Sequence, residues 1–167
     1  MKKEIFADLA VFLMVLILIS LLYVAHRLPL FGFTGNIFLK SMCKGSAACF
    51  RGVVKNVIDG DTLEINGETV RLALVDTPEK WEDGYETAKN FTESICSVGS
   101  NAIVDEDDLQ TSRSHRRIVA VVYCKTNEKF VNLNEELLKA GYAVVLTDFC
   151  NRSEFANEEW AKLNGCG

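Results

Sequence analysis

Between Arg51 and Tyr123, short runs of apolar and β-branched residues alternate with turn residues, a pattern typical of β-strands. We expect five strands, over RGVVKNVI, DTLEI, ETVRLALV, AIVDED and RIVAVVY. Asn66-Gly67 separates the second run from the third. Both residues accept a positive φ at low cost, so the pattern predicts a hairpin with a two-residue turn there.

Three helical stretches are expected between and after these strands, over Tyr85–Ser97, Leu133–Ala140 and Glu154–Leu163. Asn132 and Ser153 are suited to cap the second and third helices, and Gly141 is suited to end the second. One helix follows the third strand and two follow the last strand. This order predicts an α+β fold built on a small closed β-barrel, of which the five-stranded OB-fold is the simplest form.

The first part of the chain has a different pattern. Leu9 to Ala25 form an uncharged and strongly apolar run of 17 residues, with Ser20 as the polar residue in its middle. With its flanks the run approaches the roughly 20 residues that span a bilayer as one transmembrane helix. It ends in YVA without a clear Ala-x-Ala site, so we favour an anchor over a cleaved signal sequence. We expect an anchor or signal sequence over 1–27, a tether over 28–49 and the globular domain over 50–167.

All six cysteines follow the apolar run, and none forms a CxxC pair of the kind that suggests zinc or thioredoxin chemistry. An even number of cysteines in a small domain indicates disulfides formed outside the cytoplasm, although the sequence leaves their pairing open. The lysines and arginines on the two sides of the apolar run are nearly balanced, so they indicate the orientation only weakly. We expect a monomer whose domain is extracytoplasmic, either membrane-anchored or secreted.

The domain is acidic. From Leu28 onward the chain carries 15 Lys and Arg against 21 Asp and Glu, a net charge of −6. This is not the composition of a basic nucleic-acid coat protein. It also disfavours a non-catalytic module that binds single strands, because such a module needs a basic groove.

Charged residues nevertheless gather around the predicted hairpin. Its register makes Asp61 a diagonal neighbour of Arg71. Strict alternation along the strands would place the two side chains on opposite faces of the sheet. A shared site therefore requires a bulge or sharp coiling near Gly60. Beyond the third strand, Asp76 and Glu79 are expected beside the base of the hairpin, because the intervening proline ends strand pairing.

Three carboxylates at one end of a barrel repel one another unless a positive charge lies among them. Their hard oxygen atoms suit calcium or magnesium. A divalent ion and two arginines together would stabilise the charge that develops on a phosphoryl group in its transition state. Arg71 is one candidate, and Arg116 or Arg117 is the other. Glu79 is placed to orient and deprotonate the attacking water.

Several motifs occur in a characteristic order: DGDT, VRL, VDTPE, GYETAKNFT, an arginine before an AVVY-type strand, and NLNEELLKAGYA. Each is a modest signal alone, but together and in order they are specific. From near Val54 to near Phe149 the chain resembles the thermonuclease family typified by staphylococcal nuclease. The resemblance implies an OB-fold barrel and calcium-dependent hydrolysis of DNA and RNA that releases products with a 3′-phosphate.

Position by position, the resemblance implies a calcium site at Asp61 and Asp76, with Thr77 as a ligand through its backbone carbonyl. It implies that Glu79 is the general base and that Arg71 and Arg117 bind the phosphate.

Two places depart from the family's pattern. His115-Arg116 stands where a Tyr-Gly pair is frequent, and Thr147 and Phe149 stand where the type member has two tyrosines. His115 and Phe149 are therefore candidate substrate-binding residues, and the lost hydroxyl groups affect nucleotide affinity and substrate preference.

Simpler interpretations exist for each residue taken alone. Asp61 can be a turn residue, Arg71 a surface partner of a neighbouring glutamate, and Glu79 a residue that favours the start of a helix. The whole domain can be a non-catalytic OB module, or a cell-surface interaction domain in which calcium only adds stability. These alternatives do not explain why all the residues occur in one order, so we prefer a calcium-dependent nuclease. Removal of Glu79 distinguishes the nuclease from the other two classes, because it should abolish hydrolysis in the first and change nothing in the others.

Overall fold

The computed structural model describes residues 13–23, 42–112, 116–127 and 129–167. The chain divides into two units, Met1–Phe38 and Leu39–Gly167. Residues 13–23 of the first unit form a helix with exposed apolar side chains. Within the described ranges, no helix has both the length and the apolar character needed to cross a membrane. The rest of the predicted anchor, at 1–12 and 24–27, lies outside those ranges.

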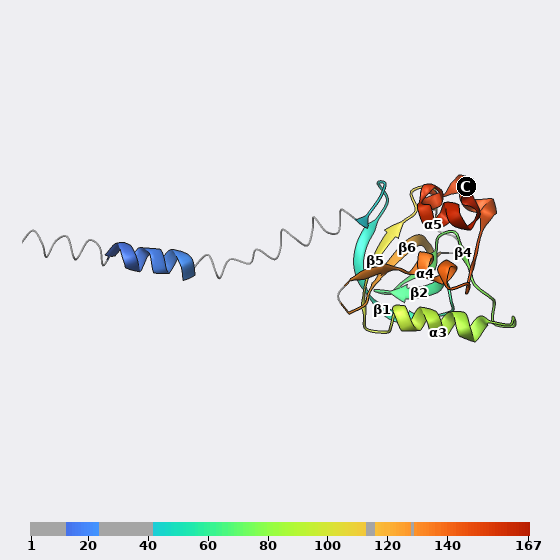
Figure 1. The fold of residues 1–167 in the computed structure, drawn as a ribbon, viewed down its shortest axis with the longest axis horizontal. Coiled ribbons are helices and arrows are strands. Elements are labelled where there is room, and N and C mark those ends of the chain that lie inside the picture. Colours follow the sequence, from blue (N-terminus) through green and yellow to red (C-terminus); the bar gives the residue numbers. More distant parts are fainter. Residues whose placement is uncertain (1–12, 24–41, 113–115, 128) are drawn as a thin grey trace, which may run out of the picture. The chain divides into compact units, whose positions relative to one another are not determined.

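The second unit is a closed β-barrel with helices packed against it (Figure 1). Its sheet has the order β3-β2-β1-β5-β6-β7, and a parallel pairing of β3 with β6 closes the barrel. The strands are β1 Cys49–Val57, β2 Thr62–Ile65, β3 Glu68–Leu72, β5 Asn101–Glu106, β6 Ile118–Lys125 and β7 Phe130–Asn132. A separate two-stranded sheet pairs β4, Val75–Asp76, with β8, Val144–Val145. The closed ring consists of β1, β2, β3, β5 and β6, and β7 pairs with the C-terminal part of β6. The predicted five-stranded barrel is therefore confirmed, and it fits the OB-fold.

The hairpin between β2 and β3 has the predicted turn and register. Asn66 and Gly67 have φ values of 54° and 86°, and Ile65 pairs with Glu68. The bulge expected near Gly60, as a way to bring Asp61 and Arg71 to one site, is not observed there. The register shift lies in β1 instead, between Val54 and Asn56. Asp61 precedes β2, so strand alternation does not fix the direction of its side chain.

Two of the three predicted helices form as single helices, α3 at Tyr85–Ile95 and α4 at Leu133–Lys139. The Asn132 side chain caps α4 by accepting a hydrogen bond from the Glu135 N–H at 3.3 Å. The third prediction is wrong as a continuous helix, because Glu158 has an extended backbone that interrupts it. The predicted stretch is divided among η2 Glu154–Asn157, α5 Glu159–Ala161 and the start of η3 Lys162–Cys166, and a further short helix, η1 Thr147–Arg152, precedes it.

The barrel interior is apolar and closely covered. Most of the largest fully buried side chains come from the strands, α4 and η2, and they include Phe155, Leu63, Ile65, Leu72, Ile103, Leu133 and Leu137. Burial of such side chains stabilises a fold by about 1.5–3 kcal/mol each. This core holds the strand ends that carry the acidic and basic residues in fixed positions.

All six cysteines are paired, as Cys43–Cys49, Cys96–Cys124 and Cys150–Cys166. The first disulfide closes a loop that contacts the barrel, where the Lys44 N–H donates to Asp105 Oδ2 at 2.9 Å. Packed structure thus extends to the N-terminal side of residue 50. The sequence predicted disulfides but not which cysteines pair.

Candidate active site

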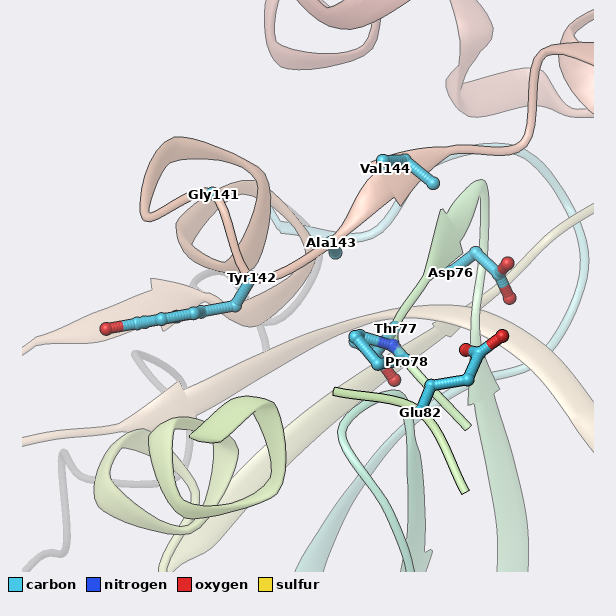
Figure 2. Close-up of a pocket in the computed structure, with 8 residues that line it drawn as sticks. All are labelled: Asp76, Thr77, Pro78, Glu82, Gly141, Tyr142, Ala143 and Val144. Carbon is cyan, nitrogen blue, oxygen red and sulfur yellow. The ribbon is translucent and has the colours of Figure 1, made fainter. Parts of the chain in front are cut away.

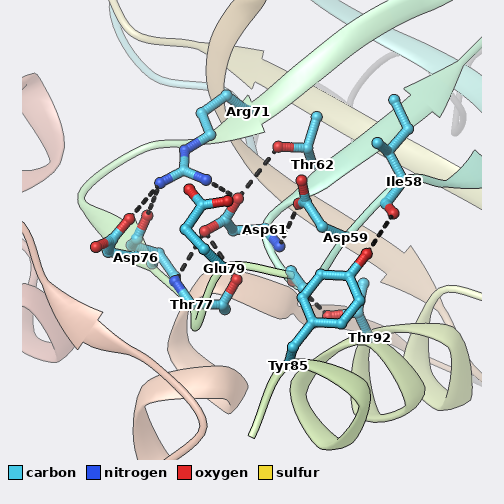
Figure 3. A network of polar contacts seen from close by, with 12 residues as sticks. Ile58, Asp59, Asp61, Thr62, Arg71, Asp76, Thr77, Glu79, Tyr85 and Thr92 are labelled. Carbon is cyan, nitrogen blue, oxygen red and sulfur yellow. Dashed lines mark hydrogen bonds and ion pairs between the residues drawn. The ribbon is translucent and has the colours of Figure 1, made fainter. Parts of the chain in front are cut away.

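Asp61 is the buried centre of a polar network at one end of the barrel (Figure 3). Its side chain is 1% exposed. Oδ2 accepts hydrogen bonds from the Thr77 N–H at 2.8 Å and the Thr77 hydroxyl at 2.9 Å. Oδ1 accepts from the Thr62 hydroxyl at 3.1 Å and forms an ion pair with Arg71. A buried carboxylate needs such partners, because an isolated charge is costly to remove from water.

Arg71, on β3, lies between two carboxylates (Figure 3). One guanidinium nitrogen contacts Asp61, and the other lies 2.6 Å from Oδ1 of Asp76. The second nitrogen also donates to the Val75 carbonyl at 3.3 Å. The arginine side chain is only 17% exposed, so its charge acts in surroundings that screen it weakly. Arg71 therefore neutralises the two acids that the sequence assigned to a metal site.

Gly60 allows the loop before β2 to approach Thr77. A Cβ atom at Gly60 would come within 2.7–2.9 Å of the Thr77 side chain, closer than real Cβ contacts. The Gly60 carbonyl also accepts a hydrogen bond from the Thr92 hydroxyl of α3 at 2.5 Å. These contacts fix Asp61 against the residues that follow β4.

Glu79 is exposed and stands in a tight turn that closes on Glu82. The Glu79 N–H donates to Oε2 of Glu82, and the Glu82 N–H donates to the Glu79 carbonyl, both at 2.8 Å. Figure 3 shows the Glu79 carboxylate on the same side of the network as Asp61 and Arg71. The sequence analysis did not single out Glu82, and only a Glu-x-x-Glu spacing in a turn could have drawn attention to it.

One pocket of about 200 Å³ brings together Arg71, Glu79, Arg117 and Phe149. Arg117 immediately precedes β6, whose parallel pairing with β3 places Val119 opposite Arg71. Barrel closure thus brings Arg71 on β3 and Arg117, just before β6, to the same pocket. Arg116 is exposed, has a φ of 68° and does not line the pocket, which agrees with the choice of Arg117 as the second arginine. We name this hollow the arginine pocket.

A neighbouring pocket of about 230 Å³ holds Asp76 and Thr77 (Figure 2). Figure 2 shows the carboxylates of Asp76 and Glu82 on one side of this pocket and the Tyr142 ring on the other. The predicted site residues therefore divide between two adjoining hollows, with the Asp61 network at their boundary. His115, the remaining predicted residue, lies outside the described residues.

Asp61 and Asp76 have the chemistry of calcium ligands, but they do not belong to a compact group of ligand atoms among the described residues. Among the described residues, one group of three acidic or cysteine side chains has all its ligand atoms within 4.8 Å of one another, and it consists of Asp105 and the paired Cys43 and Cys49. Asp61 and Asp76 offer hard carboxylate oxygens that suit calcium. The Arg71 guanidinium fills the space between them.

The closed barrel, the acidic network around Asp61 and the two arginines of the arginine pocket are the features of a staphylococcal nuclease-like domain. The chain belongs to this family: the model described as "Staphylococcal nuclease homologue" matches residues 69–164. The match contains Arg71, Asp76, Glu79, Arg117 and Phe149, whereas Asp61 precedes it.

Two curated proteins are similar to this chain. "Uncharacterized protein MJ1439" of Methanocaldococcus jannaschii is 34% identical over 146 residues, which cover 71% of this chain and 70% of that protein. "Succinoglycan biosynthesis protein ExoI" of Rhizobium meliloti is 29% identical over 120 residues, which cover 67% of this chain and 61% of that protein. The similarity to the second protein thus spans less than two thirds of its length.

Proposed function

We propose that this protein is a calcium-dependent nuclease that hydrolyses phosphodiester bonds of DNA and RNA. The observation that carries the proposal is the arginine pocket, in which a carboxylate and two arginines from separate parts of the chain line one hollow. Membership of the staphylococcal nuclease homologue family supports the same conclusion. Neither a binding module nor a structural domain requires these three side chains to meet.

In the proposed reaction, Glu79 acts as the general base. Its carboxylate takes a proton from a water molecule, whose oxygen attacks the phosphorus atom. The bond from phosphorus to the 5′-oxygen breaks, the 3′-phosphate remains on one product, and the 5′-oxygen takes a proton from solvent. Arg71 and Arg117 donate hydrogen bonds to the phosphoryl oxygens and stabilise the charge that develops on them.

Asp61, Asp76 and the Thr77 carbonyl are the proposed calcium ligands. Calcium held there would supply positive charge beside the scissile phosphate. Calcium would compete with Arg71 for these carboxylates, because Arg71 forms ion pairs with Asp61 and Asp76. We infer that Arg71 leaves the two carboxylates and turns to the phosphate when those carboxylates hold a cation.

We further propose that the domain acts outside the cytoplasm as a monomer, either secreted or anchored by the apolar run near the N-terminus. The three disulfides support this location, because such bonds persist in oxidising compartments. The apolar run from Leu9 to Ala25 supports the anchor.

The test compares the full chain with Glu79→Gln, after oxidative folding in mild detergent. Cleavage of single-stranded DNA and of RNA is measured with calcium, with magnesium and with a chelator. Because a glutamine side chain cannot accept the proton, we expect the substitution to lower kcat at least about 100-fold. Glu86→Gln is the matched control, since Glu86 is exposed on α3 and lines none of the pockets described. A folded wild-type chain that cleaves nothing, or full activity in Glu79→Gln, would refute the proposed function.

A further inference from the structure

The 3-10 helix η1 carries two side chains that act as a unit at the edge of the arginine pocket. The Arg152 guanidinium lies over the Phe149 ring, 4.6 Å from the ring centroid. Phe149 lines the arginine pocket and also the next hollow, whereas Arg152 lines only the next one. Phe149 thus separates the two hollows, and Arg152 lies on the side of the second one.

This next hollow, which we name the Arg152 pocket, has a volume of about 180 Å³. It is lined by Leu109, Gln110, Ser112, Val119, Phe149 and Arg152. Gln110, Val119 and Phe149 also line the arginine pocket, so the two hollows adjoin along one groove. An amide, a hydroxyl and a guanidinium line this pocket, together with apolar side chains.

The position of Arg152 suits it to bind an anion. Its guanidinium makes a cation–π contact with the Phe149 ring and carries a planar fork of N–H groups that can contact two phosphate oxygens at once. Arg152 is exposed, and within the described parts of the chain no carboxylate lies at ion-pair distance from it. A positive group beside the arginine pocket is notable in a chain whose net charge is −5.

The surrounding structure also holds this pair in place. Cys150, between the two side chains in sequence, is bonded to Cys166 near the end of the chain. Directly after Arg152, Ser153 is buried, and its hydroxyl accepts a hydrogen bond from the Phe155 N–H at 3.3 Å. A backbone that is already held in place loses little conformational entropy when a ligand binds to its side chains.

We propose that the Arg152 pocket binds a second phosphodiester group of the substrate strand, next to the one that is cleaved. Arg152 contacts this phosphate, and Gln110 and Ser112 contact the adjoining sugar or base. The inference rests on the proposed function and extends it, because it makes the protein selective for polynucleotides over substrates with a single phosphodiester. Arg152 is a binding residue in this account and takes no part in the chemical step.

The test compares the wild-type full chain with Arg152→Gln on two substrates, single-stranded oligothymidylate and the dinucleotide TpT, which has one phosphodiester and no flanking phosphate. We expect the substitution to raise KM for the oligonucleotide about tenfold and to leave its kcat unchanged, because one charge-assisted contact is lost. TpT should be cleaved by both proteins with the same kcat/KM. Lys55→Gln is the control, since Lys55 is an exposed cation on β1 that lines none of the three pockets.

Binding separates this inference from the proposed function. Oligothymidylate affinity is measured by fluorescence anisotropy in Glu79→Gln and in the double variant Glu79→Gln, Arg152→Gln, at several salt concentrations. Arg152→Gln should weaken binding about tenfold and reduce the dependence of log affinity on log salt by about 0.7. Absence of cleavage by the wild type refutes only the proposed function. Equal oligonucleotide affinity in the two variants, or an equal loss on TpT, overturns the Arg152 pocket.

Discussion

Asp105 is a buried carboxylate that lies outside the two pockets around Asp61. It is 1% exposed, Oδ2 accepts the hydrogen bond from the Lys44 N–H, and Oδ1 has no hydrogen-bond partner among the described residues. Burial raises the pKa of Asp105 to about 6, and the nearby charges of Glu154 and Asp108 add to the shift. The folded protein therefore holds this proton at a pH where the unfolded chain has already released it.

The raised pKa predicts how stability depends on pH. As pH rises from about 4 to about 6, the unfolded chain loses the Asp105 proton more readily than the folded chain does. The free energy of unfolding therefore falls across this range, by at most about 3 kcal/mol. Asp105→Asn keeps an acceptor for Lys44 and removes the charge. We expect this variant to be more stable than the wild type at neutral pH and to depend less on pH across that range. Denaturant unfolding at a series of pH values measures both effects.

Asp108 supplies the contrasting control. The N–H groups of Ala47 and Ser46 donate to its carboxylate and lower its pKa. Its contribution to stability is therefore present at neutral pH and is lost as pH falls. Asp108→Asn should reduce stability at neutral pH, opposite in sign to Asp105→Asn. If both variants lose stability at neutral pH, the charge of Asp105 is not the destabilising feature.

The turn from Glu79 to Glu82 is a small element that positions the proposed general base. The Glu82 side chain accepts the Glu79 N–H, so its removal frees the backbone of Glu79. Glu82→Ala should lower kcat about tenfold with little change in KM, because it affects the direction of the base more than substrate binding. Glu82→Gln retains a carbonyl acceptor and should recover most of kcat. Steady-state kinetics that show equal losses in the two variants would contradict a positioning role.

Elements set by local chemistry could be predicted from the sequence. The Asn66-Gly67 turn fixed the β2–β3 register, and the Asn132 cap marked the start of α4. Elements set by distant contacts could not be predicted. The two-residue strands β4 and β8 are too short to leave a periodic pattern, and the extended backbone at Glu158 breaks a stretch that looks helical in isolation.

The residues of the candidate site also differ in whether the sequence could predict them. Asp61, Arg71 and Glu79 were found from motifs within one short stretch of sequence. The grouping of Arg71 and Glu79 with Arg117 and Phe149 depends on barrel closure and on the path of η1, which bring together residues far apart in the chain. No motif of the candidate site contains Arg152, which becomes visible only through its contact with the Phe149 ring.

At the scale of the whole molecule, the negative net charge opposes the binding of a nucleic acid, which is itself a polyanion. The net charge is −5, and Arg71, one of the two arginines of the arginine pocket, is held by Asp61 and Asp76. A cation on those carboxylates would cancel negative charge and release Arg71 to the substrate, so both effects favour binding. Calcium at the proposed site would thus control affinity for nucleic acid as well as the proposed chemical step.

This argument predicts that chelation weakens substrate binding even where no reaction occurs. In Glu79→Gln, affinity for oligothymidylate should fall at least about tenfold when calcium is replaced by a chelator at constant ionic strength, a change of about 1.4 kcal/mol. Fluorescence anisotropy measures the effect, and Asp76→Asn should reduce the response to calcium because it removes a proposed ligand. Unchanged affinity in the chelator would mean that Arg117 and Arg152 attract the strand without a cation, and that Arg71 remains paired with Asp61 and Asp76 when substrate binds.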